Sequence, residues 1–261
     1  DHPHPLASIQ EGFDFAIGTY AEGFENDGGQ PLRHTRATLY LRSIGWVVID
    51  RVEGHGEHRI EPLWHFHPDC SVTVEGDHVV TTDSGVGNLR IQPAGDVEWN
   101  VEIVKGREKP QPQGWYSRKY GEYRPAACAV YDATIEGEAT FAWIMTPARD
   151  LPAAAGIDWL DAPEGVARLR VAFPGQVART LTVAMDEMAL PIQLDDDHHL
   201  TARLLVEQEG EAPRIALGRL ERGSEVLAAE PLPVMPALLD MATSLRLRAR
   251  PDVNEDDPHR H

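Results

Sequence analysis

Cysteine and long apolar runs are scarce in this chain of 261 residues, and each shortage excludes a class of protein. Cys70 and Cys128 are the only cysteines, and no Cys-x-x-Cys metal motif occurs, so one disulfide and two free thiols both stay open. No apolar run approaches the roughly 20 residues that a membrane helix needs, and we therefore expect no membrane insertion. The hydrophobic residues, 42% of the total, suffice for one large or two modest cores.

Positive charge is also scarce, because the formal net charge at pH 7 is −18. A nucleic-acid backbone binds to basic surface, so the charge argues against nucleic acid as a partner. An anionic polysaccharide is compatible with it, since a few arginines that line a cleft can outweigh the global charge locally. The opening Asp-His-Pro-His-Pro has neither a basic start nor an apolar run, so we expect no signal peptide in this sequence. The missing initial methionine favours a fragment or a processed form.

Twenty prolines and 22 glycines separate short runs that are rich in valine, isoleucine, leucine and aromatic residues. This pattern predicts an all-β protein, with an antiparallel β-sandwich over residues 10–148. A linker at 149–164, a second, smaller β-rich extension at 165–250 and a disordered tail at 251–261 complete the predicted organisation. The strands expected in the sandwich are Phe13–Tyr20, Arg36–Leu41, Trp46–Val52, Ile60–His67, Ser71–Glu75, His78–Thr82, Asn88–Gln92, Val97–Val104, Ala127–Glu136 and Glu138–Met145.

The most informative segment runs from His34 through Asp50 and reads as a β-hairpin. Alternation places His34 and Arg36 on one face of the first strand, while its aliphatic residues occupy the other. A three-residue turn would set Asp50 opposite Arg36 and diagonal to His34, close enough for both to reach one ion. A slip of one residue would send Asp50 to the apolar face. The predicted site therefore depends on register.

The following strand adds His65 and His67, which share a face, while Trp64 and Phe66 point toward a predicted core. Two imidazoles and one carboxylate form a ligand set suited to zinc, with a position open for water or substrate. His34, Asp50 and His65 are the candidate ligands, with His67 as the alternative to His65. The plainer interpretation is a cross-strand salt bridge between Asp50 and Arg36, with His65 and His67 hydrogen-bonded to backbone groups at the edge of a sheet.

A third candidate segment is Gly114-Trp-Tyr-Ser, followed by Tyr120-Gly121. Aromatic faces beside polar groups suit sugar rings, so Trp115, Tyr116 and Tyr120 are candidate substrate-binding residues. The alternative is a loop whose aromatic side chains close the end of the sandwich. Asp195-Asp-Asp197-His-His199 looks superficially like a metal cluster, but a solvated turn explains it better.

Taken in order, these motifs resemble the C-terminal β-sandwich of the heparinase II/III-like polysaccharide lyases. The resemblance covers about residues 10 to 148, and the segments that carry it are His34-x-Arg36, Trp46-Val-Val-Ile-Asp50, Gly56-Glu-His58, Trp64-His-Phe-His-Pro68 and Gly114-Trp-Tyr-Ser117. It implies a parent protein with an N-terminal α/α toroid that this chain lacks. It also implies β-elimination on a uronate-containing polysaccharide in a cleft between the toroid and the sandwich.

In such a lyase this chain would form one wall of the cleft and would be inactive, or nearly so, by itself. The resemblance matches His34 and Asp50 to two ligands of a structural zinc, with the His65/His67 pair nearest to the third. Many members carry a Tyr-Phe-Arg-Gly-Thr…His-Asn-Thr segment that is missing here. His34 can alternatively face the substrate, with Arg36 pairing to its carboxylate, which makes these two the candidate catalytic residues. A periplasmic or extracellular location is favoured by the resemblance, and a cytoplasmic one stays open.

A rival from another class is a non-catalytic carbohydrate-binding or scaffold module that uses Trp115, Tyr116 and Tyr120. A cupin-like or epimerase-like enzyme is the weaker third reading. A cupin's metal set would require a glutamate after His65-x-His67, and no suitable one follows.

Overall fold

The computed structural model describes residues 5–21 and 32–230, and the predicted tail at 251–261 lies outside them. Within the described ranges, regular structure is β-strand apart from one 3₁₀ turn at Glu187–Ala189. The all-β prediction is thereby confirmed. None of the described residues forms a helix long and apolar enough to cross a membrane. Cys70 and Cys128 are both free thiols.

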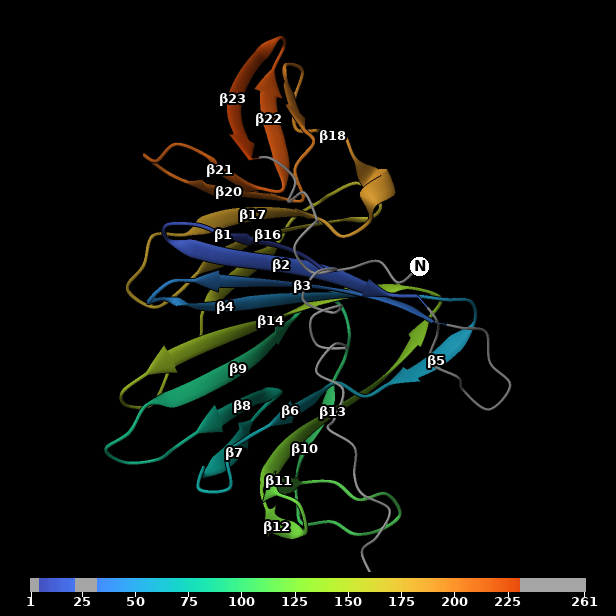
Figure 1. Ribbon diagram of the computed structural model, residues 1–261, viewed down its shortest axis with the longest axis vertical. Coiled ribbons are helices and arrows are strands. Elements are labelled where there is room, and N and C mark those ends of the chain that lie inside the picture. Colours follow the sequence, from blue (N-terminus) through green and yellow to red (C-terminus); the bar gives the residue numbers. More distant parts are fainter. Residues whose placement is uncertain (1–4, 22–31, 231–261) are drawn as a thin grey trace, which may run out of the picture. The chain divides into compact units, whose positions relative to one another are not determined.

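A large antiparallel sheet forms the middle layer (Figure 1). Its strands lie in the order β1-β2-β3-β4-β14-β9-β8-β7, and neighbouring strands are hydrogen-bonded. In chain order their bounds are Leu6–Ile9 (β1), Phe13–Tyr20 (β2), Arg33–Leu41 (β3), Gly45–Glu53 (β4), Val72–Glu75 (β7), His78–Thr81 (β8), Asn88–Ala94 (β9) and Ala139–Ala148 (β14). Because β1 to β4 pair in chain order, each antiparallel to the next, the N-terminal part of the sheet has the strand order of a meander.

A smaller sheet covers part of one face of this layer. It consists of β10 (Asn100–Lys105), β13 (Ala127–Glu136), β5 (Glu57–Ile60) and β6 (Leu63–His65), the last pairing only with β13. Between the two sheets lies an aromatic-rich core that contains Trp143, Tyr131 and Phe141. Trp143 is fully buried and meets Tyr131 edge-on, with ring centroids 4.7 Å apart. This pairing of sheets is the predicted sandwich.

The predicted single strand Ile60–His67 is wrong, because β5 and β6 are separate strands. Both pair with β13, and the register is the same on either side of the break, since Ile60 faces Ala133 and Leu63 faces Val130. Pro62 lies in the gap; it has no backbone N–H to donate, so the ladder is interrupted there. Its carbonyl still accepts from the backbone N–H of Tyr131 at 3.0 Å. The interruption therefore leaves the alternation of side chains intact.

The opposite face of the middle layer packs on a five-stranded sheet. This sheet has the order β15-β16-β17-β20-β21, and its strands are Gly156–Trp159, Val166–Ala172, Arg179–Ala184, Leu204–Gln208 and Arg214–Ala216. Phe13 and Leu39 of the middle layer share one hydrophobic core with Leu169 and Leu181. Strand β15 lies within the segment that the sequence analysis assigns to a linker, and the predicted division into domains stays a prediction.

The remaining strands form two small sheets. β18 (Ile192–Gln193), β19 (His198–Leu200), β22 (Gly218–Arg222) and β23 (Glu225–Glu230) make a sheet with its own cluster around Leu200 and Leu220. A two-stranded hairpin combines β11 (Trp115–Lys119) with β12 (Glu122–Pro125).

The β3–β4 hairpin has the register that the sequence analysis requires. Leu41 pairs with Gly45 across a three-residue turn in which Ser43 has a positive φ of 62°. Arg36 consequently pairs with Asp50. The aliphatic residues of β3 face the core shared with the five-stranded sheet, as burial of Leu39 and Leu41 shows. His34 and Arg36 therefore lie on the other face of the sheet.

Candidate functional site

The centre of the candidate site is the carboxylate of Asp50, which lies on β4 with 1% of its surface exposed. Its Oδ1 accepts from Nε2 of His34 and from Nε of Arg36, both at 2.7 Å. Its Oδ2 accepts from Nη2 of Arg36 and from the indole Nε1 of Trp143, both at 2.9 Å. Four N–H groups thus surround a single carboxylate, so both of its oxygens are hydrogen-bonded twice.

These donors keep Asp50 ionised. Burial acts to raise the pKa of the carboxyl group, but the hydrogen bonds from His34 and Arg36, together with the charge of Arg36, lower it below its ordinary value. An ionised carboxylate only accepts hydrogen bonds, so Nε2 of His34 is the protonated nitrogen that donates to it. The orientation of the imidazole is fixed through this bond.

A pocket of about 420 Å³ opens beside these residues. Its lining includes His34, Arg36 and Asp50 from the hairpin and Arg59 and Pro62 from the β5–β6 segment. Arg59 is itself paired, to Asp132 and Glu61. The lining thus contains two guanidinium groups and an imidazole together with the carboxylates of Asp50 and Glu61. An anionic group of a ligand would pair with the partly exposed Arg36.

Arg36 also borders a second, more apolar pocket. The centre of its guanidinium lies 5.6 Å from the ring centroid of Trp64, within the range of a cation–π contact. Trp64 and Trp46 help to line this pocket of about 340 Å³. The ring of Trp46 stacks on Tyr40 with centroids 4.7 Å apart. Because 43% of the Arg36 side chain is exposed, the group stays accessible beside both pockets.

The structure does not bring His65 and His67 to Asp50. Nε2 of His65 lies 3.3 Å from Oε1 of Gln113. The His67 ring meets that of Tyr116 edge-on at 5.6 Å, and its Nδ1 lies 3.5 Å from a carboxylate oxygen of Asp69. The alternation predicted for this segment is correct, because Trp64 and Phe66 pack against the aromatic core. That same alternation turns the histidines to the outer side, while Trp64 reaches Arg36.

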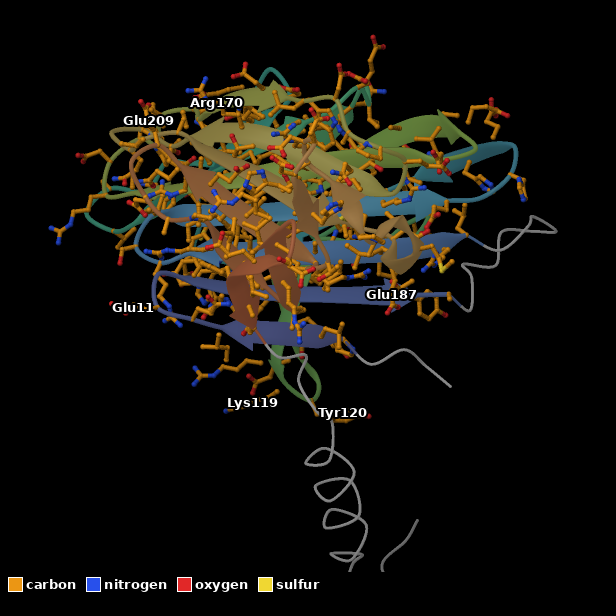
Figure 2. The ribbon with its side chains drawn as sticks, turned by 90° about the horizontal axis from the view of Figure 1, so that it is seen from above. Glu11, Lys119, Tyr120, Arg170, Glu187 and Glu209 are labelled. Atoms are coloured by element: carbon orange, nitrogen blue, oxygen red, sulfur yellow. The ribbon has the colours of Figure 1, made fainter. Side chains whose placement is uncertain are left out.

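The three candidate sugar-binding aromatics lie in and beside the β11–β12 hairpin, a segment that reads as loop-like in the sequence. Trp115 is partly buried and donates its indole N–H to the carbonyl of Arg107 at 2.9 Å. Tyr116 contacts His67. Tyr120 is fully exposed at the turn of the hairpin, and its side chain points away from the ribbon in Figure 2. Trp115 is therefore tied into the fold, whereas Tyr120 is accessible to a partner.

The donors at Asp50 do not by themselves fit the zinc that the family resemblance implies. Two atoms bound to one tetrahedral zinc at about 2.0–2.1 Å lie roughly 3.3 Å apart. The His34 and Asp50 atoms are 2.7 Å apart, a direct hydrogen bond. Among residues 5–21 and 32–230, no group of three or more histidine, cysteine, aspartate or glutamate side chains is arranged to hold a metal ion. The zinc stays a prediction.

Sequence reasoning missed Trp143 and misjudged the role of Trp64. Trp143 lies within a predicted strand and Trp64 is correctly expected in the core, yet the first binds Asp50 and the second lies against Arg36. No spacing rule connects Trp143 with Asp50, which is 93 residues away. A buried indole N–H usually has a hydrogen-bond acceptor. A tryptophan in a core strand is therefore the only sequence feature that could have suggested a polar partner for it.

The chain is similar to one protein family and to several solved structures of lyases. A family model described as "Heparinase II/III-like, C-terminal" matches residues 8–144. A comparison with the curated proteins found no match. Among solved structures, heparan sulfate lyase HepC from Pedobacter heparinus is 18% identical with a TM-score of 0.56, over 70% of this chain and 28% of that one. A mutant of the same lyase has a TM-score of 0.57 at the same identity and coverage.

Heparinase III is similar as well, with 18% identity, a TM-score of 0.53 and coverage of 69% of this chain and 27% of that one. The chain therefore spans less than a third of the length of these structures. At such low identity the likeness shows a common fold.

Proposed function

By the match over residues 8–144, the chain belongs to the heparinase II/III-like C-terminal family, and we propose that it forms one wall of the substrate cleft of a polysaccharide lyase. The substrate class is a uronate-containing, anionic polysaccharide, in line with the heparan sulfate lyases that share the fold. An N-terminal toroid in the parent protein would supply the opposite wall. The observation that carries the proposal is the Arg36 guanidinium, which Asp50 holds in the lining of a 420 Å³ pocket.

β-Elimination at a uronate requires three groups. A base takes the proton from C5, a positive or hydrogen-bonding group neutralises the carboxylate, and an acid protonates the glycosidic oxygen as the C4–O bond breaks. The electron pair of the C5–H bond becomes the new C4–C5 double bond. The proton that leaves C5 stays on the base, and the leaving oxygen receives its proton from the acid.

Arg36 and His34 match two of these tasks. The guanidinium binds Asp50 through Nε and Nη2, and no described residue is hydrogen-bonded to its Nη1, which suits an incoming carboxylate. Asp50 fixes the His34 ring through Nε2, so the imidazole is held in the lining of the pocket as the group that would carry a proton to or from the substrate. A fixed ring and a fixed positive charge reduce the reorganisation that the reaction requires.

The decisive test is a lyase assay on the full-length parent polypeptide with uronate-containing polysaccharides, read by the ultraviolet absorbance of the unsaturated product. We expect Arg36→Gln and His34→Ala each to lower kcat/KM by roughly 10²-fold. Arg170→Gln is the matched control, because Arg170 is an exposed arginine on β16, in another sheet. Wild-type activity in both site variants would refute the assignment.

A non-catalytic carbohydrate-binding module is the second candidate, and the complete exposure of Tyr120 favours it. An exposed aromatic ring on a hairpin offers a flat apolar surface for a sugar ring at little cost, while the neighbouring Lys119 adds a positive charge. In this case Tyr116 would assist at the side of the hairpin, and Trp115 would hold the hairpin in place.

Binding of a uronate-containing oligosaccharide to the isolated 261-residue chain, measured by calorimetry, separates the two candidates. Loss of binding in Tyr120→Ala but not in His34→Ala would support the binding module. Loss in His34→Ala and Arg36→Gln but not in Tyr120→Ala would support the cleft wall.

A further inference from the structure

The Asp50 site already contains the cation that a buried carboxylate needs. An unpaired ionised carboxylate in a protein interior is very costly, and such groups are paired with a cation or bind a metal. Here the fork of Arg36 supplies two parallel N–H···O bonds of 2.7 and 2.9 Å, a bidentate geometry typical of strong arginine–carboxylate pairs.

We propose that Arg36 takes the place of a metal ion at this site, so that the His34–Arg36–Asp50 cluster is built and works without zinc. The proposal concerns the cofactor of the site and holds whichever polysaccharide, if any, binds there. It replaces the expectation that His34 and Asp50 are zinc ligands.

The first argument is the occupancy of the carboxylate. All four hydrogen-bonding directions of Asp50 are used, by Arg36 twice and by His34 and Trp143 once each. A zinc ion bound to His34 and Oδ1 would have to displace the N–H groups of both His34 and Arg36 from that oxygen. The guanidinium, still bound to Oδ2 through Nη2, would then lie beside a divalent cation.

The second argument is the shortage of further ligands. His65, the predicted third ligand, lies beside Gln113, and its alternative His67 packs on Tyr116. A structural zinc site almost always has four protein ligands, and a catalytic one has three. Within the described residues, the cluster offers one imidazole and one carboxylate.

The third argument is that the chain holds Arg36 in position from both sides. Asp50 binds the edge of the guanidinium, and the Trp64 ring lies at 5.6 Å from its centre. A bidentate arginine is not interchangeable with lysine, because only the planar fork donates two parallel hydrogen bonds to one carboxylate. The group is thus a built-in part of the site.

The test measures metal and stability on the purified 261-residue chain. After dialysis against zinc chloride and then buffer, elemental analysis should show no zinc that depends on His34, so wild type and His34→Ala should give equal contents. Chelation with EDTA should leave the melting temperature of wild type unchanged. One equivalent of zinc in wild type that is lost in both His34→Ala and Asp50→Ala would overturn the proposal.

The counter-ion role is tested by substitution of Arg36. Arg36→Gln should lower the melting temperature by roughly 5 °C, and Arg36→Lys should recover only part of that loss. Arg59→Gln is the matched control, since Arg59 lines the same pocket but is more exposed. Equal shifts in Arg36→Gln and Arg59→Gln would contradict the role. Neither measurement uses polysaccharide, so failure here is distinct from failure of the proposed function.

Discussion

Replacing Asp50 with alanine is the most informative single perturbation of this protein. The substitution removes the acceptor of four hydrogen bonds that come from three side chains. Trp143 is fully buried, and its indole N–H loses the acceptor that lies 2.9 Å away. A buried donor left without a partner costs about 1–3 kcal/mol.

The charged partners contribute less than they would in a closed core. Removing one member of a buried ion pair costs about 3–5 kcal/mol when the other charge stays buried. The Arg36 side chain is 43% exposed, so its guanidinium can turn to water, and the cost must be reduced accordingly. Adding a reduced charge contribution to the indole contribution, we expect a loss of about 3 kcal/mol, somewhat over a hundredfold in the unfolding equilibrium.

Urea denaturation followed by circular dichroism measures this loss as a lower transition midpoint at unchanged slope. Asp132→Ala is the control, because Asp132 also pairs with an arginine from a neighbouring strand, but the side chain of that arginine, Arg59, is 65% exposed and its charge is screened by solvent. The control should lose several times less stability. If both substitutions cost the same, the buried hydrogen-bond network at Asp50 does not contribute as argued.

Three further outcomes are expected. The stability advantage of wild type over Asp50→Asn should be complete above the ordinary carboxyl pKa of 3.8 and should shrink as the pH falls through the lowered folded-state pKa of Asp50. Denaturation curves in which the difference in unfolding free energy between the two proteins stays constant at acid pH would contradict this. Burial raises the pKa of Cys128 to about 11, so iodoacetamide at pH 8 should alkylate Cys70 and leave Cys128 unmodified in mass spectra of the folded chain. Gly218→Ala should lower the melting temperature clearly more than Gly223→Ala. A Cβ added at Gly218 (φ 144°) would lie 2.5 Å from backbone atoms, whereas one added at Gly223 (φ 58°) would meet nothing within 4 Å. Equal shifts would show that the close approach does not matter.

The prediction of the β3–β4 register from sequence succeeded because two independent constraints agree. The aliphatic residues of β3 must face a core, and a three-residue turn at Arg42–Ile44 leaves one pairing consistent with that. The prediction of one strand over Ile60–His67 failed because Pro62 cannot donate to the ladder, a local rule that was open to the sequence analysis.

The candidate site was predictable only in part. Arg36 opposite Asp50 follows from the pattern of one hairpin, and the diagonal position of His34 follows with it. The indole of Trp143 arrives from β14, and Trp64 arrives from a different sheet. The sides on which His65 and His67 lie depend on how β6 pairs with β13.

The amino-acid sequence by itself determined the all-β class, the faces of the strands and the cross-strand partner of Asp50. These features depend on the alternation of side chains along each strand and on one short turn. Covalent geometry and residue type control both of them. Only the tertiary structure decided that Asp50 is buried, that a guanidinium and an indole occupy its oxygens, and that the later histidines lie elsewhere. Those outcomes depend on which sheet covers which face, and contacts between residues far apart in the chain carry no periodic signal in a single sequence.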